Sequence, residues 1–258
     1  MNHPHTPLAG KKGLIVGIAN DNSIAYGCAR VLRDLGAELA VTYLNSKAEK
    51  YVRPLADQLE ASLVLPLNVE EPGQLEAVFR DVEAHWGKLD FLIHSIAFCP
   101  MDDLHGRVVD CSRDGFLQAM HVSCFSFVEM AKLAEPLMKD GGSLITMTYY
   151  GADKVVENYN IMGPVKAALE STSRYLAHEL GPKGIRVHAV SPGLLKTRAA
   201  SGIAHFDQLI DEAIARAPQN KLVDIEDVGQ TCAFLISDIS RAITGQVIYV
   251  DGGFNIMA

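Results

Sequence analysis

Short apolar runs alternate with longer amphipathic stretches through most of the sequence. The runs are rich in β-branched residues and mostly apolar throughout, which is typical of parallel strands covered on both faces. Seven runs are predicted to be strands, at residues 13–18, 38–43, 63–67, 90–96, 143–149, 185–190 and 246–250. Six stretches have helical period, at residues 23–35, 47–59, 74–86, 112–138, 160–180 and 225–237. The alternation predicts an α/β fold: a doubly wound, Rossmann-type, seven-stranded parallel sheet with helices on both faces.

One segment interrupts this alternation. Residues 191–193, Ser-Pro-Gly, are not expected to continue a strand, and the small residues 199–202 follow them. The segment comes after the sixth predicted strand, at the carboxyl edge where open α/β sheets bind their ligands. We therefore predict a substrate lid at residues 194–219, within one domain that spans residues 1–258. An ordinary long loop with one short helix fits the composition nearly as well.

The composition is that of a folded globular protein, with 48% hydrophobic and 21% charged residues. A net charge of -8 argues against a nucleic-acid partner, although it leaves room for one small anionic site. The five cysteines include no CxxC pair, which favours reduced thiols in a cytoplasmic protein over disulfides or structural zinc. We find no apolar core of an export signal and no apolar run of membrane-spanning length.

The first predicted strand runs into a turn of small and polar residues, 17–23, that opens a helix. Such a turn lets a pyrophosphate approach the backbone, and the helix dipole attracts the negative charge. The turn does not match GxGxxG, and a purely structural strand-to-helix turn explains it equally well. The tip of the second strand carries neither an acid nor an Arg, which favours NADH over NADPH, with Lys47 as the one reservation.

A second candidate site contains Tyr159 and Lys166, which are seven residues apart. On a helix this spacing is about two turns, or about 10 Å, so both side chains would leave the same face. A tyrosine hydroxyl beside a lysine ammonium can stabilise a developing oxyanion. A packed ring and a solvated charge would give the same spacing.

Other catalytic classes lack their residues. The sequence contains no GxSxG, HExxH or GxxxxGK[ST] motif, so hydrolase, zinc-protease and P-loop functions are not supported. The nine histidines form no cluster with ligand spacing, and no metal site is predicted. We interpret His94, inside a predicted strand, as a core histidine whose ring is hydrogen-bonded.

Taken together, these residues resemble the short-chain dehydrogenase/reductase superfamily and, within it, the enoyl-acyl-carrier-protein reductases of bacterial fatty-acid synthesis. The resemblance spans nearly the whole chain. It rests on residues 23–27, 94–96, 158–163 with Lys166, 199–203, 225–229 and 250–254. The commoner ketoreductase branch has its lysine four residues after the tyrosine, where this chain has Gly163. Tyr149, ten residues before Tyr159, matches a second tyrosine of the enoyl reductases, while Thr146 stands where a ketoreductase often has serine.

The resemblance implies hydride transfer from NADH to the β carbon of a trans-2-enoyl thioester, with NADPH not excluded. Tyr159 would meet the enolate oxygen, Lys166 would hold the nicotinamide ribose, and Tyr149 would line the acyl site. The implied catalytic residues are Tyr149, Tyr159 and Lys166, and the implied substrate contacts are Cys99, Tyr149 and Tyr159. The implied cofactor contacts are Gly17, Ser23, Ile24, Leu44, Asn68, Val69, Ile96, Lys166, Leu195, Lys196, Thr197, Arg198 and Ala199.

The resemblance also implies an acyl carrier protein as partner and a homotetramer. Four features depart from the family pattern: Ala97 for glycine, Asn68 for aspartate, Arg198 for leucine, and Ser-Pro-Gly-Leu-Leu at residues 191–195. Two alternatives stay open. The first is another dehydrogenase of the superfamily, acting on a 3-ketoacyl thioester or an alcohol. The second is a non-catalytic dinucleotide-binding regulator.

Overall fold

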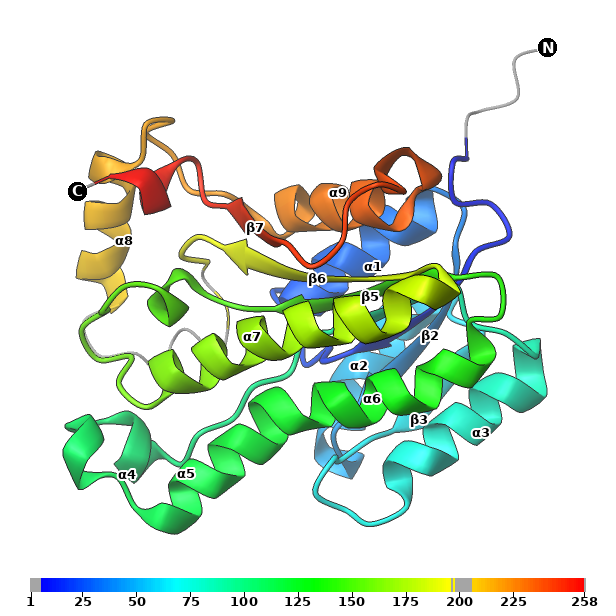
Figure 1. Cartoon of the computed structure of the whole chain (residues 1–258), viewed down its shortest axis with the longest axis horizontal. Coiled ribbons are helices and arrows are strands. Elements are labelled where there is room, and N and C mark those ends of the chain that lie inside the picture. Colours follow the sequence, from blue (N-terminus) through cyan, green and yellow to red (C-terminus); the bar gives the residue numbers. More distant parts are fainter. Residues whose placement is uncertain (1–5, 196, 198–205, 258) are drawn as a thin grey trace.

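One parallel sheet forms the centre of the molecule. The computed structural model describes residues 6–195, 197 and 206–257. Their seven strands are ordered β3-β2-β1-β4-β5-β6-β7, and every neighbouring pair is parallel. Helices lie on both faces of the sheet (Figure 1). The predicted doubly wound fold is therefore confirmed, and the strand order reverses between β1 and β4, where such sheets bind ligands.

The strands lie close to their predicted positions. They are β1 Lys12–Val16, β2 Glu38–Tyr43, β3 Leu63–Pro66, β4 Phe91–His94, β5 Gly142–Met147, β6 Ile185–Pro192 and β7 Val247–Val250. The prediction that the sixth strand ends before Pro192 was wrong. Pairing of β6 with β5 stops at Val190, so the missing N–H of Pro192 leaves no β5 carbonyl without a donor. On its other side, Pro192 still pairs in register with Val250 of β7.

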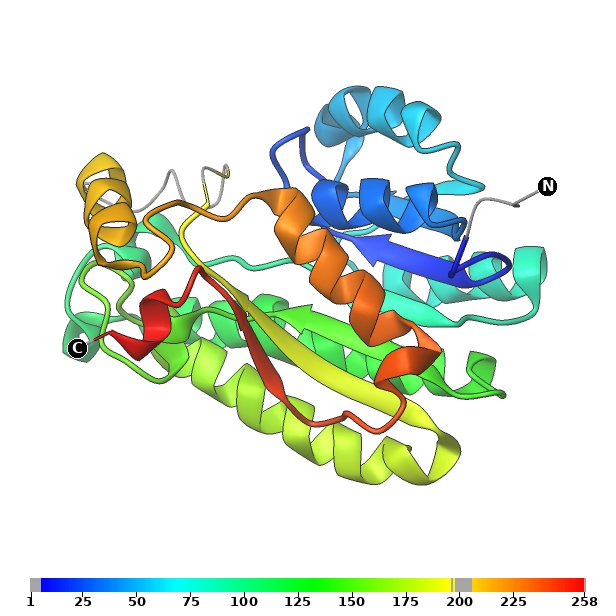
Figure 2. The same ribbon diagram turned by 90° about the horizontal axis from the view of Figure 1, so that it is seen from above.

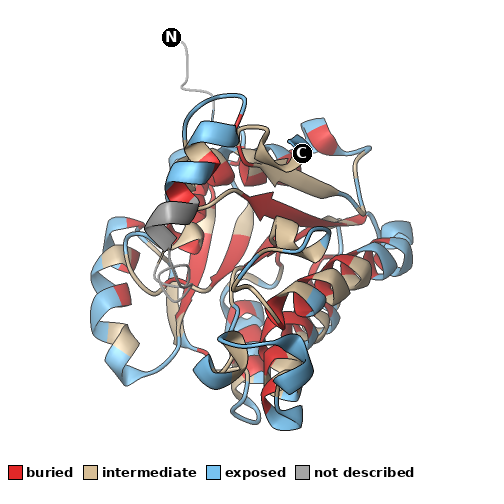
Figure 3. Ribbon diagram, turned by 90° about the vertical axis from the view of Figure 1, so that its left-hand side faces the viewer, coloured by how far each residue is buried: buried red, intermediate tan, exposed pale blue. Residues whose placement is uncertain are grey.

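The helices of each face pack with alternate residues of the strands. They are α1 Ile24–Asp34, α2 Ser46–Gln58, α3 Gln74–Trp86, α4 Met101–Leu104, α5 Arg113–Met120, α6 Ser126–Ala134, α7 Met162–Leu180, α8 Phe206–Arg216 and α9 Ile225–Ile236. Leu14 and Val16 of β1 belong to the apolar core with α3, α5, α6 and α7. Ile15 between them belongs to the core with α1, α2 and α9. Figure 3 shows buried strands between helices whose outer faces are exposed.

Two predicted helices differ in detail. The stretch predicted as one helix at 112–138 is α5, a π-helical turn at His121–Phe125, α6 and a final 3₁₀ turn. Apolar periodicity does not reveal such a turn, because a single i→i+5 turn shifts the apolar face only locally. The helix predicted from residue 160 begins at Met162, so Tyr159 precedes it.

The elements at one end of the sheet surround the site. α8, α4 and the C-terminal segment lie at the end toward which the β6 arrow points (Figure 1). Viewed from above, α1 and α9 lie side by side on one face (Figure 2). Their contact is close because a Cβ on Gly27 would stand 2.5 Å from the Ile225 backbone oxygen. The first turn of α1 is thereby fixed relative to α9.

Candidate active site

The turn between β1 and α1 is built for close backbone approach. Gly17 has φ +114°, and a Cβ there would lie 2.1 Å from the Ser95 carbonyl oxygen, so only glycine fits. The Ser23 hydroxyl accepts from the N–H groups of Ala19 and Asn20, each at 3.0 Å. Ser23 makes no side-chain cap on α1, and the first turn of α1 holds no acidic residue. A pyrophosphate could therefore bind at this helix N-terminus, where Ile24 begins the helix.

A cavity of about 390 Å³ opens between the ends of β2 and β3. It is lined by Tyr43, Leu44, Asn45, Ser46, Glu49, Pro66, Asn68, Glu71 and Gln74. The structure thus brings together Leu44 and Asn68, two of the cofactor contacts that the family resemblance implies. Val69, the next residue, packs on the core below α3. The volume of the cavity and the side chains that line it suit an adenosine.

The acidic groups of this cavity are Glu49 and Glu71. Asn45 caps α2, and its side-chain oxygen accepts from the N–H groups of Lys47 and Ala48 at 3.0 Å each. These two N–H groups are therefore already hydrogen-bonded within the cap. A further phosphate on the adenosine ribose would meet the Glu71 carboxylate, the Glu49 carboxylate in its ion pair with Arg53, and a capped helix end.

Tyr149 and Tyr159 lie edge to face, with ring centroids 4.9 Å apart. Tyr159 sits in the turn before α7, between Asn158 and Asn160, which have φ +62° and +43°. Asparagine tolerates this left-handed region better than most residues. A Cβ on Gly151 would lie 2.7 Å from the Tyr159 ring, so the missing side chain makes room for that ring.

Lys166 lies on the first part of α7 and is 5% exposed. Its Nζ donates to the Met147 carbonyl oxygen at 2.8 Å, which ties α7 to the end of β5. Burial lowers the pKa of Lys166 to about 8, and the nearby Cys124 and Glu170 oppose that shift. Burial raises the pKa of Tyr159 well above its usual value, and Tyr149 and Glu170 add to this effect. Tyr159 is therefore a neutral hydrogen-bond donor.

The prediction of a shared helical face for Tyr159 and Lys166 was wrong, because Tyr159 precedes α7. Separate contacts, and not a shared helical face, bring the two residues to the end of β5. The turn at residues 157–161 presents Tyr159 to Tyr149, while the Met147 carbonyl binds Lys166. All three candidate catalytic residues therefore meet at the carboxyl end of β5.

His94 is a core histidine, as predicted. Its Nδ1 is 2.8 Å from the Thr146 hydroxyl and its Nε2 is 2.9 Å from the Ser126 hydroxyl. Burial lowers the pKa of His94 to about 3, and the Lys166 charge adds to this, so the ring is neutral. Thr146 is fully buried and bound to this ring, which separates its hydroxyl from the tyrosine pair.

The loop after β4 carries Ile96 and Cys99, which both pack against the core below α7. The Ser123 hydroxyl in the π-helical turn holds this loop, because it accepts from the Phe98 N–H at 2.9 Å and donates to the Phe98 carbonyl at 3.1 Å. Burial raises the pKa of Cys99 to about 11. The thiol is therefore neutral and suited to contact, not to nucleophilic attack.

Only part of the predicted lid can be placed. Leu195 is buried against the core with α1 and α9, and Thr197 is half-buried. The cofactor contacts predicted at Lys196, Arg198 and Ala199 lie outside the described residues.

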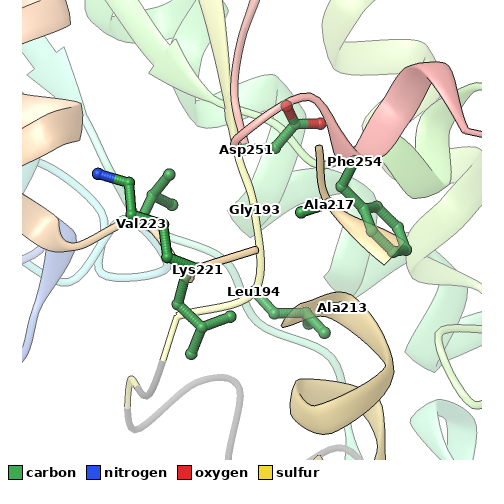
Figure 4. Close-up of a pocket in the computed structure, with 9 residues that line it drawn as sticks. Gly193, Leu194, Ala213, Ala217, Lys221, Val223, Asp251 and Phe254 are labelled. Carbon is green, nitrogen blue, oxygen red and sulfur yellow. The ribbon is translucent and has the colours of Figure 1, made fainter. Parts of the chain in front are cut away.

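Within the described part of the predicted lid, α8 packs on the C-terminal segment. Figure 4 shows Ala213 of α8 and Ala217, the residue after α8, facing Gly193, Asp251 and Phe254 around a small cavity. The volume of that cavity is about 10 Å³, enough for one water molecule and no more. The Arg216 guanidinium stacks over Phe254 with 5.1 Å to the ring centroid, which fixes the end of α8.

Comparisons with known proteins decide the family. A family model described as enoyl-(acyl carrier protein) reductase matches residues 17–255. The chain belongs to this enoyl-acyl-carrier-protein reductase family. An enoyl-[acyl-carrier-protein] reductase [NADH] of Rickettsia felis is 46% identical over 250 residues, 97% of this chain and 96% of the relative. One of Synechocystis is 47% identical over 253 residues, 97% of this chain and 98% of the relative.

Solved structures of the family agree in fold. The reductase of Anaplasma phagocytophilum in complex with NAD has a TM-score of 0.94 and 43% identity, covering 98% of this chain and 96% of that one. The Bacillus cereus enoyl-acyl carrier protein reductase with NADP+ and indole naphthyridinone has a TM-score of 0.95 and 44% identity, covering 97% and 98%.

Sequence reasoning missed three features of this site. The missed residues are Glu170 with Thr148, Ser123, and Gly151. Glu170 follows Lys166 by four residues on α7, and this i,i+4 spacing was the one signal that could have drawn attention to it. The part of the chain that the structure describes holds no cluster of metal-ligating side chains and no helix long and apolar enough to cross a membrane.

Proposed function

We propose that this enoyl-acyl-carrier-protein reductase family member reduces trans-2-enoyl thioesters on acyl carrier protein to saturated acyl thioesters in fatty-acid biosynthesis. NADH is the hydride donor. The observation that carries the proposal is the Tyr149–Tyr159 pair, with ring centroids 4.9 Å apart, at the same strand end whose Met147 carbonyl binds the buried Lys166. The proposed catalytic residues are these three.

The turn at Gly17 fits a dinucleotide, because a Cβ there would clash with the Ser95 backbone and displace the turn whose N–H groups would face a pyrophosphate. Ser23 and Ile24 would hold the pyrophosphate, and Leu44, Asn68 and Val69 the adenosine. Ile96, Leu195 and the segment from Lys196 to Ala199 would cover the nicotinamide end. When bound, this cofactor supplies the hydride for the β carbon of the substrate.

Tyr159 acts on the thioester oxygen. Hydride addition at the β carbon places negative charge on that oxygen, and the neutral Tyr159 hydroxyl donates a hydrogen bond to it. A proton from solvent then adds to the α carbon of the enolate and gives the saturated thioester. The Lys166 ammonium, with a pKa of about 8, is mostly charged at neutral pH and stabilises the same charge. Tyr149 packs on Tyr159 and fixes its ring, and Cys99 contacts the acyl group as a neutral thiol.

A ketoreductase is the less well supported alternative. Gly163 stands where that branch has its lysine, and a Cβ there would lie 3.1 Å from the Gly151 carbonyl oxygen. Thr146, where that branch often has serine, is bound to His94 inside the core. Neither position offers the group that a ketoreductase needs beside Tyr159.

We propose NADH over NADPH on the charges of the adenosine cavity. Glu71 would repel the 2′-phosphate of NADPH, Glu49 would do so less because its carboxylate is ion-paired with Arg53, and Asn45 already binds two α2 N–H groups. We expect the dissociation constant for NADPH to exceed that for NADH by roughly tenfold or more, which corresponds to about 1.4 kcal/mol. Fluorescence titration measures both values. Equal affinities, or tighter NADPH, would remove these carboxylates from cofactor selection.

Further proposals concern the assembly and the surroundings of the site. Residues 194–219 form a lid within one domain, and Lys196 and Arg198 meet the acidic carrier protein.

Leu117, Phe125 and Tyr175 are each more than half exposed on or beside α5 and α7, which supports a homotetramer with helix-to-helix contacts. The cysteines at 28, 99, 111, 124 and 232 are all free, which fits a cytoplasmic protein.

The test follows absorbance of NADH with crotonyl thioester and, separately, with acetoacetyl thioester, each repeated with NADPH. The proposal predicts oxidation of NADH with the crotonyl substrate only. Turnover of the acetoacetyl substrate alone would establish a ketoreductase. Binding of NADH with no turnover of either substrate would leave the non-catalytic regulator.

A further inference from the structure

Three consecutive residues at the end of β5 each contact a different part of the candidate site. The Met147 carbonyl accepts from Lys166, the Thr148 hydroxyl donates to the Glu170 carboxylate at 2.8 Å, and the Tyr149 ring packs on Tyr159. The Thr148 N–H continues the ladder to β6 through the Val190 carbonyl at 2.8 Å. The middle residue is therefore held on one side by the sheet and on the other by α7.

Glu170 has no part in the proposed reaction, yet it is buried there. It is 9% exposed, and its hydroxyl partner Thr148 is 4% exposed. A buried carboxylate is costly unless it is paired, and burial raises the pKa of Glu170 despite the Thr148 hydrogen bond. A buried carboxylate that destabilises the fold points to a use of its position or its charge in the site.

The charged and titratable groups around Glu170 come from several elements. Lys166 and Arg174 lie one turn before and one turn after it on α7, and both favour its ionised form. Asp153, after the 3₁₀ turn that follows β5, opposes ionisation. Glu170 in turn raises the pKa values of Tyr159 and of Tyr249 on β7. Lys166 also faces Cys124 and His94.

The spacing makes the pair of contacts a two-point attachment. Lys166 and Glu170 are i,i+4 neighbours, so they leave α7 on the same face about one turn apart. Their partners, Met147 and Thr148, are adjacent on the strand end. Two attachments fix both the distance and the rotation of the strand end relative to α7, whereas one attachment would leave a pivot.

We propose that Glu170 is a positioning residue: through Thr148 it holds the end of β5 against α7, and so sets the positions of Lys166 and Tyr149 for the reaction. This inference rests on the proposed function. Glu170 touches neither the substrate nor the reacting atoms. A displacement of the catalytic groups by a fraction of an ångström is enough to slow the reaction strongly.

The test compares four substitutions with the wild-type enzyme. Thr148→Val removes the hydroxyl and keeps the shape, and Thr148→Ser restores a hydroxyl. Glu170→Leu removes the acceptor, while Glu170→Gln keeps an acceptor oxygen and removes the charge. Ser173→Ala is the matched control, because the buried Ser173 hydroxyl on α7 donates only to Leu169 of its own helix, at 2.9 Å.

We expect Thr148→Val and Glu170→Leu each to lower kcat by about tenfold, because the strand end loses one of its two attachments and the catalytic groups shift. The dissociation constant of NADH should change less than threefold, because the turn at Gly17 is intact. Thr148→Ser and Ser173→Ala should keep kcat within about twofold. The Glu170→Leu, Thr148→Val double variant should be no slower than either single variant, as expected for one shared contact.

Glu170→Gln tests the charge. Loss of the carboxylate lowers the pKa of Lys166, so kcat should begin to fall at a lower pH than in the wild type. A merely structural role would change the melting temperature but not this pH profile. Thr148→Val and Glu170→Gln conserve side-chain shape, and they decide the question if Glu170→Leu does not fold. Wild-type kcat and pH profile in both would overturn the proposal.

A failure of the proposed function is recognised separately, because the wild-type enzyme would then not reduce the crotonyl thioester. The position of Glu170 is in that case tested by NMR titration of ¹³Cε-labelled lysine, with the Lys166 signal assigned by its absence in Lys166→Arg. A lower Lys166 pKa in Glu170→Gln and a shifted Lys166 signal in Thr148→Val support the attachment. Unchanged signals in both variants would overturn it without any measurement of turnover.

Discussion

At the scale of single residues, burial determines which groups of the site carry charge. Tyr159 and Tyr149 are desolvated, and both pKa values are raised above that of a free tyrosine. Lys166 is desolvated as well, and its pKa falls to about 8. The site therefore offers a neutral donor and an ammonium at neutral pH. This pairing suits an oxygen that gains charge during the reaction.

Tyr159→Phe removes the donor and keeps the ring against Tyr149. We expect kcat to fall by about 100-fold, since the hydroxyl matters mainly when the enolate forms. NADH affinity should stay within about twofold of the wild type. Stopped-flow absorbance and fluorescence titration measure the two quantities. Wild-type turnover in this variant would take Tyr159 out of the mechanism.

Lys166→Met should lower the activity of the enzyme and raise the stability of its fold. The folded-state pKa of Lys166 lies near 8, below its usual 10.5, so the folded protein binds fewer protons than the unfolded chain between these values. Burying the ammonium therefore opposes folding most below pH 8, by an amount on the order of 3 kcal/mol. That cost is relieved as the pH rises from 8 to 10.5.

The methionine has no charge to bury, so the melting temperature should rise by several degrees at pH 7. Turnover and NADH affinity should both fall. Calorimetry and an NADH titration provide the comparison. Unchanged NADH affinity would argue against contact between Lys166 and the cofactor ribose.

At the scale of elements, the sheet edge and the first turn of α1 position the cofactor groove. Gly17 permits the contact of the turn with Ser95, and Gly27 permits the contact of α1 with α9. Both helices pack on the same core. A change in the packing between α1 and α9 therefore moves the N-terminus at which the pyrophosphate is expected.

Gly27→Ala tests this connection. A Cβ at Gly27 would lie 2.5 Å from Cβ and from the carbonyl oxygen of Ile225, so α1 must shift. We expect a loss of about 2 kcal/mol of unfolding free energy from overpacking, with weaker NADH binding. Gly181→Ala is the control, because a Cβ there meets nothing within 4 Å. Equal stability and NADH affinity in the two variants would show that α1 tolerates the displacement.

The sequence predicted the elements of the sheet better than the local geometry of the site. Apolar runs mark all seven strands, because helices cover both faces of the sheet. The five inner strands are mostly buried, whereas the edge strands β3 and β7 are half-buried. The seven-residue spacing places Tyr159 and Lys166 on one helix, whereas Tyr159 lies in a turn. Asn158 and Asn160 adopt left-handed conformations there, which the apolar periodicity does not reveal. The contact of Thr148 with Glu170 depends on how β5 meets α7, which only the assembled fold determines.

At the scale of the whole molecule, the two cores on either side of the sheet contain buried histidines that must stay neutral. His94 joins β4 to β5 and α6 through Thr146 and Ser126, and its pKa is lowered to about 3. His188 on β6 is also fully buried, and burial lowers its pKa to about 4. Both rings are neutral in the folded protein at pH 6.

Acid should therefore weaken the fold before most carboxylates titrate. Below pH 6.5 the unfolded chain binds a proton at His94 that the folded protein does not, so stability falls as the pH drops toward 3. The slope is about 1.4 kcal/mol per pH unit for each such histidine. The free energy of unfolding, measured in urea, should fall less between pH 7 and pH 5 for His94→Gln than for the wild type. The exposed His85→Gln should keep the wild-type difference, and an unchanged difference in His94→Gln would contradict this account.

The central claim is that hydride goes to the β carbon of an enoyl thioester with Tyr159 as donor to the thioester oxygen. The most direct test is turnover of crotonyl thioester with NADH that carries deuterium at the transferred position, followed by mass spectrometry and NMR of the product. The account predicts butyryl thioester with one deuterium at C3, formed about 100-fold more slowly by Tyr159→Phe. Unreacted crotonyl thioester, or deuterium at any other carbon, would contradict it.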